Sequence, residues 1–305
     1  MNISILYGGV STEHKISLQT GLAVAEAIKG IYNLEMVNLE ENIYQSPHNL
    51  LDADLVFNAL HGGDGENGTI QAYLDLHHIN YTGSGSKASK IAMDKNISKF
   101  IAQSVDILTP NWVLIKKNQY TGLKLQNHDT PKFTYPYVVK PSNEGSTYGL
   151  SIVHDENELS DAIGLAAEYS NEILIEEYIP GRELTVGILG NKSLPIIEIL
   201  PSHDLYDYEC KYTEGMSKYI VPAELSDYLV RKLSEDALKI YNIIGCRHYA
   251  RADFRLNEKD EIYFLEINTL PGMTSTSLLP KAGKAAGLEF PELIETIIKI
   301  ATWEK

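Results

Sequence analysis

Two pairs of polar residues stand at two-residue spacing in the C-terminal part of the chain. Together they carry two carboxylates, an amide and a guanidinium. Arg251 and Asp253 form the first pair, and Glu266 and Asn268 form the second. Residues two apart in an extended strand share a face, so each pair points to one side of its strand. Carboxylate and amide oxygens suit a hard divalent cation, and the guanidinium suits an anion that the cation carries.

The sequence around these pairs predicts a β-hairpin, because two β-prone runs flank the polar turn 257–260. If the turn holds those four residues, Arg251 lies opposite Glu266, with Asp253 diagonal to it. A turn of odd length or a bulge would put the polar groups of the two strands on opposite faces. A charged hairpin face is also commonly just the solvated face of a sheet, and alternation alone leaves both interpretations open.

Two further features favour a site over a solvated face. Leu265 and Ile267 bracket Glu266, which predicts a strand that is apolar on one side. Asn268 is followed by the loop 269–277, whose small residues suit backbone contact with a ligand.

Length and composition limit the possible classes of protein. A chain of 305 residues can bury a large core and divide into two or three domains. The net charge of -15 argues against nucleic acid or an anionic membrane as the main partner. Two cysteines without ligand spacing indicate a reducing compartment. The sequence shows no signal peptide and no apolar run of about 18 residues, so no membrane helix is expected.

The first ~95 residues predict a small α/β domain of the doubly wound kind. An apolar strand at 3–7 ends in a glycine pair, and the strand at 55–60 ends in the glycine-rich loop 61–68. Open α/β sheets bind ligands at such strand ends. A helix is predicted from the loop 81–85 to about Ser104. Glycines in this loop imitate a dinucleotide fingerprint only weakly, since no acidic residue completes it.

The middle of the chain carries signals for an anion site. The strand 137–141 places Lys140 near its end, and a lysine is difficult to bury there without an anion. The loop 142–149 has the small residues of a phosphate-covering loop, although an ordinary hairpin turn would read the same way. The irregular segment 202–216, rich in tyrosine and charge, is typical of a lid or substrate loop.

Eight motifs follow one another in a fixed order: residues 8–13, 60–68, 93–95, 139–146, 175–177, 211–212, 251–253 and 266–275. In this order they resemble the ATP-grasp enzymes, and within them the D-alanine–D-alanine ligase family, over essentially the whole chain. The resemblance implies an α/β fold that is α+β in its C-terminal half. It implies an N-terminal doubly wound α/β substrate domain (1–94), a central ATP-grasp domain (95–176) and a C-terminal ATP-grasp catalytic domain (177–305).

The resemblance also implies how ATP and its metal would be held. Lys95 and Lys140 would meet the α- and β-phosphates, Glu183 the ribose, and Lys211 the γ-phosphate. Two Mg²⁺ ions, or Mn²⁺, would be ligated by Asp253, Glu266 and Asn268. The remaining residues that the resemblance assigns to ATP lie in the loop after Lys140 and at the adenine edge: Glu144, Gly145, Ser146, Thr147, Glu176, Glu177, Tyr178 and Ile179.

The reaction that the family implies joins two D-alanine molecules through an acyl phosphate. Glu13 would bind the first ammonium and Arg251 the oxyanion, while Ser146 and Tyr212 would complete a hydrogen-bonded catalytic set. The other substrate-binding residues that the resemblance assigns are His61, Gly272, Ser277 and Leu278. The family further implies D-alanine and ATP as partners, a cytoplasmic homodimer and a role in peptidoglycan synthesis.

Two alternatives remain beside this interpretation. One is an ATP-grasp ligase that joins a different acceptor. The other is a non-catalytic nucleotide-binding module that uses the N-terminal glycine loops. The second alternative would leave the hairpin carboxylates, Arg251 and the lysines without a task.

Overall fold

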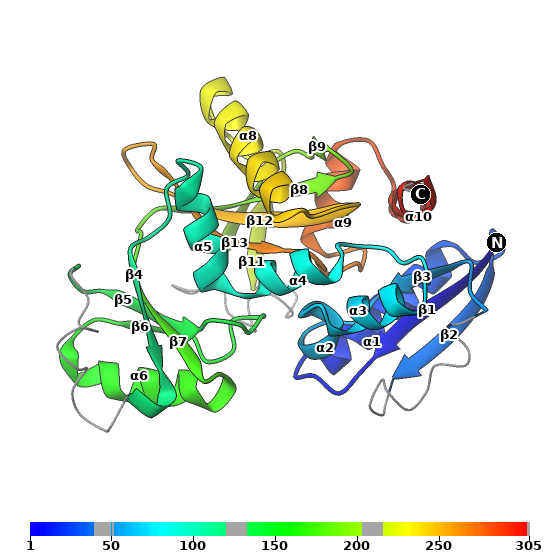
Figure 1. The fold of residues 1–305 in the computed structure, drawn as a ribbon. Coiled ribbons are helices and arrows are strands. Elements are labelled where there is room, and N and C mark those ends of the chain that lie inside the picture. Colours follow the sequence, from blue (N-terminus) through cyan, green and yellow to red (C-terminus); the bar gives the residue numbers. More distant parts are fainter. Residues whose placement is uncertain (40–49, 51, 120–132, 203–215, 304–305) are drawn as a thin grey trace.

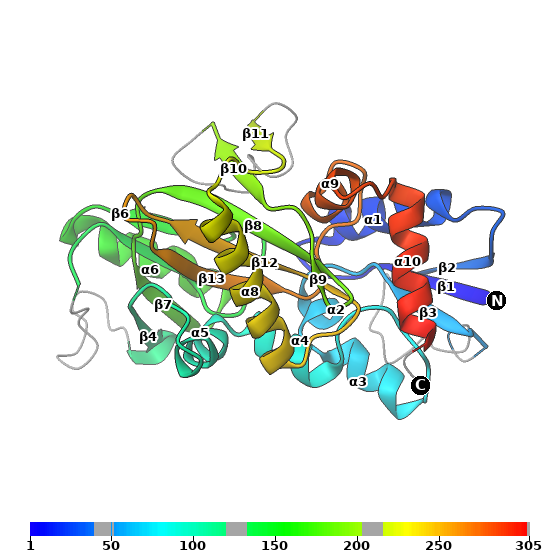
Figure 2. The ribbon, with the colours of Figure 1, turned by 90° about the horizontal axis from the view of Figure 1, so that it is seen from above.

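The computed structural model describes residues 1–39, 50, 52–119, 133–202 and 216–303. These residues form three β-sheets with helices packed against them (Figures 1 and 2). Among the described helices, none combines the length and the hydropathy needed to cross a membrane. Lys211 and Tyr212, and most of the predicted loop 202–216, lie outside the described residues.

The N-terminal sheet is parallel, as the βα pattern predicts. Strand β1 (Asn2–Gly8) is central, between β2 (Asn33–Leu39) and β3 (Leu55–Asn58). Helix α1 (His14–Ala27) covers one face, and α3 (Thr69–Leu76) packs with Leu6 and Val56 on the other. The short helix α2 (Gly63–Glu66) follows β3 and occupies the predicted glycine-rich loop.

The last helix of the chain completes the cover of this first sheet. Helix α10 (Phe290–Trp303) lies against α1, and its Ile294 and Ile298 share a core with Ile5 and Phe57 (Figure 2). Opposite ends of the sequence therefore bury a common apolar surface.

The second sheet is antiparallel and lies beside helix α6 (Glu156–Tyr169). Its strand order is β4-β7-β5-β6: Trp112–Lys116, Glu172–Glu177, Tyr137–Pro141 and Ser151–Val153. The 3-10 turn Lys117–Gln119 follows β4. Ile163 of α6 packs on Val139 and Ile175, so alternate residues such as Lys140 and Glu176 point to the opposite face.

The third sheet is also antiparallel and carries the hairpin predicted from the sequence. Its order is β11-β10-β8-β12-β13: Ser217–Ile220, Ile197–Pro201, Arg182–Leu189, Tyr249–Leu256 and Ile262–Asn268, with β9 (Lys192–Ser193) on β8. Its apolar face packs on three helices, α4 (Ser86–Met93), α5 (Lys95–Ser104) and α8 (Asp227–Ile244). Helix α9 (Leu278–Ala285) packs against β8.

The hairpin register differs from the predicted one. Leu256 pairs with Ile262, so the turn holds five residues (257–261), and a bulge follows at Leu265. Asp253 consequently faces Glu266, and Arg251 faces Asn268. The odd-length turn and the bulge each shift the pairing by one residue, so together they return all four polar groups to one face.

Two more expectations are corrected by the local geometry. The bulge leaves Leu265 on the same side as Glu266, where it lines a pocket, so Leu265 does not belong to the apolar face. The predicted long helix ending near Ser104 is two helices, because Asp94 is extended and caps the second. Its side chain accepts a hydrogen bond from the Ile97 N–H.

Candidate active site

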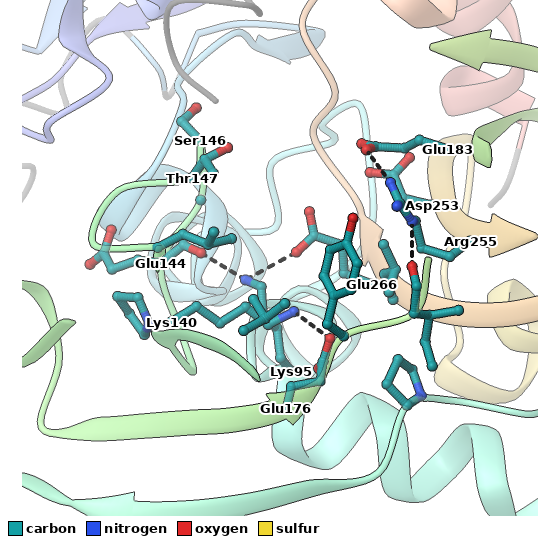
Figure 3. A pocket seen from close by; sticks show the side chains of 18 of the residues that line it. Lys95, Lys140, Glu144, Ser146, Thr147, Glu176, Glu183, Asp253, Arg255 and Glu266 are labelled. Atoms are coloured by element: carbon teal, nitrogen blue, oxygen red, sulfur yellow. Dashed lines mark hydrogen bonds and ion pairs between the residues drawn. The ribbon is translucent and has the colours of Figure 1, made fainter. Parts of the chain in front are cut away.

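Two adjoining pockets lie where the three sheets meet. The larger lies between the second and third sheets, beneath the loop 142–149 (Figure 3). The smaller is enclosed by the glycine-rich loop, the loop 142–149 and the segment 268–278. Both pockets are lined by Arg251, Glu266, Gly145 and Ser146, so the two share a wall.

Lysines from two elements gather on the wall of the larger pocket. Lys95, the first residue of α5, places its Nζ 3.1 Å from Glu266 Oε2 and donates to the Glu144 carbonyl at 2.7 Å. Lys140 Nζ lies 3.0 Å from Glu176 Oε1 (Figure 3). Both ammonium groups therefore lie at the wall of one cavity, each beside a glutamate carboxylate.

Glu176 also contacts a second lysine that the sequence did not single out. Lys99 Nζ lies 2.8 Å from Glu176 Oε2, and the Lys99 side chain is 0% exposed. Burial alone would raise the pKa of Glu176, but Lys140 and Lys99 outweigh it and lower that pKa. Burial lowers the pKa of Lys99 to about 8, against the opposing effect of Glu176. Lys99 follows Lys95 by one helical turn, and that spacing could have revealed it.

The other end of the larger pocket is bounded by residues with hydrogen-bonding side chains and backbone. Arg255 donates from Nε to the Ile179 carbonyl at 3.1 Å and from Nη1 to Glu183 Oε2 at 3.3 Å. Glu177 accepts a 2.7 Å hydrogen bond from Asn111 Nδ2. The sequence pattern had not drawn attention to Arg255, although Arg255 lies on the same strand face as Arg251.

The smaller pocket joins residues that are far apart in the sequence. The Ser146 hydroxyl donates to Glu13 Oε1, which links the loop 142–149 to the N-terminal unit. A Cβ atom at Gly62 would lie 2.9 Å from Glu13 Oε2, and one at Gly145 would lie 3.1 Å from it. Glycine on both sides therefore leaves room for the buried carboxylate of Glu13 in this position.

The loop 142–149 contains two residues with strained backbone. Ser146 and Thr147 have φ values of 49° and 64°, in the left-handed region that disfavours side chains. Such conformations persist where surrounding contacts fix them, and they concentrate at ligand-binding loops. Ser146 meets Glu13, and the Tyr148 ring packs near Tyr169.

Two buried ionisable groups in the smaller pocket are held neutral. Burial lowers the pKa of His61 to about 4, and His61 Nε2 lies 2.9 Å from Thr20 Oγ1. Burial and the neighbouring Glu13 raise the pKa of Glu66 to about 8. The Gly62 N–H donates to Glu66 Oε2 at 2.9 Å. Glu66 lies within one of the sequence motifs but received no role there.

The hairpin carboxylates bring oxygen ligands to the wall between the pockets. Asp253 accepts hydrogen bonds from Arg251 Nε at 2.9 Å and Nη2 at 2.8 Å, and one from Thr185 Oγ1 at 2.6 Å. Arg251 and Asp253 therefore form an ion pair on the same strand. Asn268 Oδ1 accepts from the Leu270 N–H at 2.7 Å. Two carboxylates and an amide on one face match the donor set that a hard divalent cation prefers.

The segment after Asn268 closes the far side of the smaller pocket. Ser277 Oγ lies 2.8 Å from Thr274 Oγ1 and accepts from the Thr274 N–H at 3.1 Å. Leu278 begins α9, so its N–H belongs to the open first turn of that helix. Gly272 lies against Ser277, where a Cβ atom would approach Ser277 Oγ to 2.9 Å.

The sequence-predicted residues gather around these two pockets. Outside the described residues lie Lys211 and Tyr212. The larger pocket is lined by Lys95, Lys140, Glu144, Gly145, Ser146, Thr147, Glu176, Glu177, Tyr178, Ile179, Glu183, Arg251, Asp253 and Glu266. The smaller one is lined by Glu13, His61, Gly145, Ser146, Arg251, Glu266, Asn268, Gly272, Ser277 and Leu278.

Two antiparallel sheets that enclose a lysine-lined pocket, preceded by a parallel α/β unit, define an ATP-grasp protein. The family profile described as "D-ala D-ala ligase C-terminus" matches residues 101–299, and "D-ala D-ala ligase N-terminus" matches 37–84. The D-alanine–D-alanine ligase of Syntrophotalea carbinolica is 41% identical over 304 residues, covering 99% of this chain and 97% of that protein. The Aquifex aeolicus ligase is 42% identical over 302 residues, covering 98% and 100%.

Solved structures show the same relationship. The Bacillus anthracis D-alanine–D-alanine ligase complexed with ATP has a TM-score of 0.85 at 35% identity, covering 99% of this chain and 97% of that one. VanG D-Ala:D-Ser ligase from Enterococcus faecalis has a TM-score of 0.83 at 28% identity, covering 98% and 99%. The chain belongs to the D-alanine–D-alanine ligase family.

Proposed function

We propose that this protein joins two D-alanine molecules to D-alanyl-D-alanine with ATP, releasing ADP and phosphate, for peptidoglycan synthesis. The observation that carries the proposal is the shared wall of Arg251 and Glu266 between a lysine-lined pocket and a smaller polar one. A reaction that passes a phosphoryl group from a nucleotide to a carboxylate needs such adjacent sites.

In the first step the carboxylate of one D-alanine attacks the γ-phosphorus of ATP, and ADP leaves. Lys95 and Lys140 hold the α- and β-phosphates, and Glu183 meets the ribose. The adenine lies along Glu176 to Ile179, largely on backbone atoms. Glu13 binds the ammonium of this D-alanine, which orients its carboxylate toward the larger pocket. The product is an acyl phosphate, a far better electrophile than the starting carboxylate.

In the second step the amine of the other D-alanine attacks the acyl carbon, and phosphate leaves from the tetrahedral intermediate. Arg251 faces the oxyanion of that intermediate. Ser277 and the Leu278 N–H receive the carboxylate of the second D-alanine. Ser146, which is hydrogen-bonded to Glu13, assists removal of the amine proton. The loop 142–149 excludes water, which would otherwise hydrolyse the acyl phosphate.

Asp253, Glu266 and Asn268 would hold the magnesium or manganese ions that accompany the nucleotide. Their register supports this assignment, because three hard oxygen donors share one face of the hairpin between the pockets. When bound, such ions neutralise negative charge on the phosphates and on the transferred group.

The division of the chain into domains and its state in the cell complete the proposal. We propose three units, residues 1–94, 95–176 and 177–305, which contribute the ammonium site, the phosphate loop and the hairpin. We also propose a cytoplasmic homodimer. The net charge of -15 and the absence of ligand-type cysteine spacing support a soluble cytoplasmic enzyme without nucleic-acid partners.

A ligase with a different acceptor is the second candidate, because the fold also matches the VanG D-Ala:D-Ser ligase. Phosphate release from Mg-ATP separates the two when D-alanine alone is compared with D-alanine plus D-serine or D-lactate. L-alanine serves as the stereochemical control. Product identity is read by mass spectrometry. D-alanine alone is expected to support turnover and yield the dipeptide, and absence of that turnover contradicts the proposal.

A further inference from the structure

Lys99 lies behind the nucleotide pocket and lines neither of the two pockets. Its side chain is fully buried, and its Nζ donates to Thr109 Oγ1 at 2.7 Å. Thr109 in turn donates to the Phe264 carbonyl on β13 at 2.8 Å. The Lys99 ammonium also lies 5.1 Å from the centre of the Trp112 ring. A lysine in this position is expensive to bury, so its charge needs an explanation.

Glu176 stands between Lys99 and the pocket. One carboxylate oxygen meets Lys99 at 2.8 Å and the other meets Lys140 at 3.0 Å. Lys140 lines the pocket, whereas Lys99 is sealed behind the carboxylate (Figure 3 shows the Lys140 side). Two ammonium groups and one carboxylate carry a net charge of about plus one in a region of low dielectric.

Without Lys99, that balance would change at the pocket wall. Glu176 and Lys140 alone form a neutral pair, and the carboxylate would compete with a phosphate for the Lys140 ammonium. With Lys99 present, the negative charge of Glu176 is already compensated from behind. Lys140 then keeps its attraction for an anion that enters from the front.

We propose that Lys99 is a positioning residue for ATP binding, which compensates Glu176 from behind and so leaves Lys140 available to the nucleotide phosphates. This inference rests on the proposed nucleotide role of the larger pocket and deepens it. Lys99 and Lys95 lie one turn apart on α5. This one helix therefore supplies Lys95, which contacts the phosphates directly, and Lys99, whose charge lies behind Glu176 and supports Lys140.

A purely structural role for Lys99 is the competing explanation, and the two make different predictions for ligand binding. Binding of ATP, ADP and adenosine is measured by calorimetry without D-alanine for the parent and three variants. Lys99→Gln removes the charge but keeps a hydrogen-bonding group, and Lys99→Arg keeps the charge. Lys99→Gln combined with Glu176→Gln restores a net charge of plus one. Lys90, an exposed lysine of α4, provides the matched control, Lys90→Gln.

Lys99→Gln is expected to weaken ATP and ADP binding about tenfold, while adenosine binding changes less than about twofold. Lys99→Arg and Lys90→Gln should stay near the parent, and the double variant should recover most of the lost ATP affinity. Equal weakening of all three ligands, or a double variant worse than Lys99→Gln, would overturn the proposal. Parent protein that binds no ATP would overturn the proposed function itself. A parent that binds ATP but does not turn over D-alanine would leave this test intact.

Discussion

The larger and the smaller pocket each contain a buried carboxylate with a different kind of neighbour: Glu176 beside lysines in the larger pocket, and Glu66 beside Glu13 in the smaller one. Glu176 is 2% exposed and Glu66 is 7% exposed, so burial scarcely distinguishes them. Glu176 has two lysines at its oxygens, and its pKa is lowered. Glu66 has a neighbouring carboxylate, Glu13, and its pKa is raised to about 8.

The contrast shows that the neighbours of a buried acid, more than its depth, decide whether it is charged. Burial disfavours the charged form of both Glu176 and Glu66, and at Glu176 the two lysines offset this desolvation cost. In the larger pocket two lysines offset the charge of Glu176, whereas in the smaller pocket Glu13 and Glu266 lie near Glu66 and raise its pKa. Such a division suits a reaction that brings a polyphosphate and an ammonium group to neighbouring sites.

Glu266 belongs to both pockets, so its removal tests whether they act as one site. Glu266→Gln is expected to lower kcat by at least about 10³-fold, because an oxygen ligand of the proposed metal loses its charge. The thermal midpoint should change little. Steady-state kinetics with D-alanine and Mg-ATP provide the measurement, and Glu258→Gln, on the exposed turn of the same hairpin, is the control. Retained turnover in Glu266→Gln would remove Glu266 from the metal site.

The two buried acids should respond very differently to the same substitution. Glu176→Gln leaves Lys99 and Lys140 without their shared partner and is expected to cost about 3 to 5 kcal/mol of unfolding free energy. Glu66→Gln replaces a protonated carboxyl by a similar neutral group and removes the proton uptake that lowers the stability of the parent at pH 7, so the unfolding free energy should stay the same or rise. Urea denaturation of the parent and both variants measures these changes in unfolding free energy. Equal losses would mean that burial alone governs these sites.

The smallest expected effect concerns the pH dependence of stability at Glu66. The folded pKa of about 8 lies above the unfolded value of 4.5, so the folded protein keeps a proton that the unfolded chain releases. This contribution is complete below about pH 4.5 and is lost as the pH rises through 8. Glu66→Gln stays neutral throughout.

The thermal midpoint of Glu66→Gln relative to the parent should therefore increase between pH 5 and pH 9, by about 3 °C or more. Differential scanning calorimetry across this range provides the measurement. A difference that is constant with pH would mean that Glu66 is ionised in the folded protein.

Much of the site could be predicted from the sequence because strands repeat every two residues. Asp253, Glu266 and Asn268 were found by that spacing, and the eight motifs gave the family and its fold. The pairing of the hairpin could not be predicted, since five turn residues and a bulge at Leu265 compensate each other. Neither departure has a strong signal in a single sequence, and each alone would have separated the polar groups.

Contacts between distant segments were the other part that the sequence could not supply. The pairing of Lys99 with Glu176 joins α5 to β7; the spacing from Lys95 points to Lys99, but nothing in the sequence specifies its partner. The neighbours of Glu66 come from Gly62 and from Glu13, which lies on another loop, so its neutral state emerges only in three dimensions. Charge states of buried groups depend on such neighbours, whereas strand faces depend on local spacing.

The packing of α10 on the first sheet has a consequence for how the chain is made. Ile5 and Phe57 are synthesised early, but Ile294 and Ile298, which help to cover them, are added only at the end. On the ribosome this apolar face has only α1 as its cover while more than two hundred residues are added. We therefore expect the first sheet to acquire its full native packing only after α10 has been synthesised.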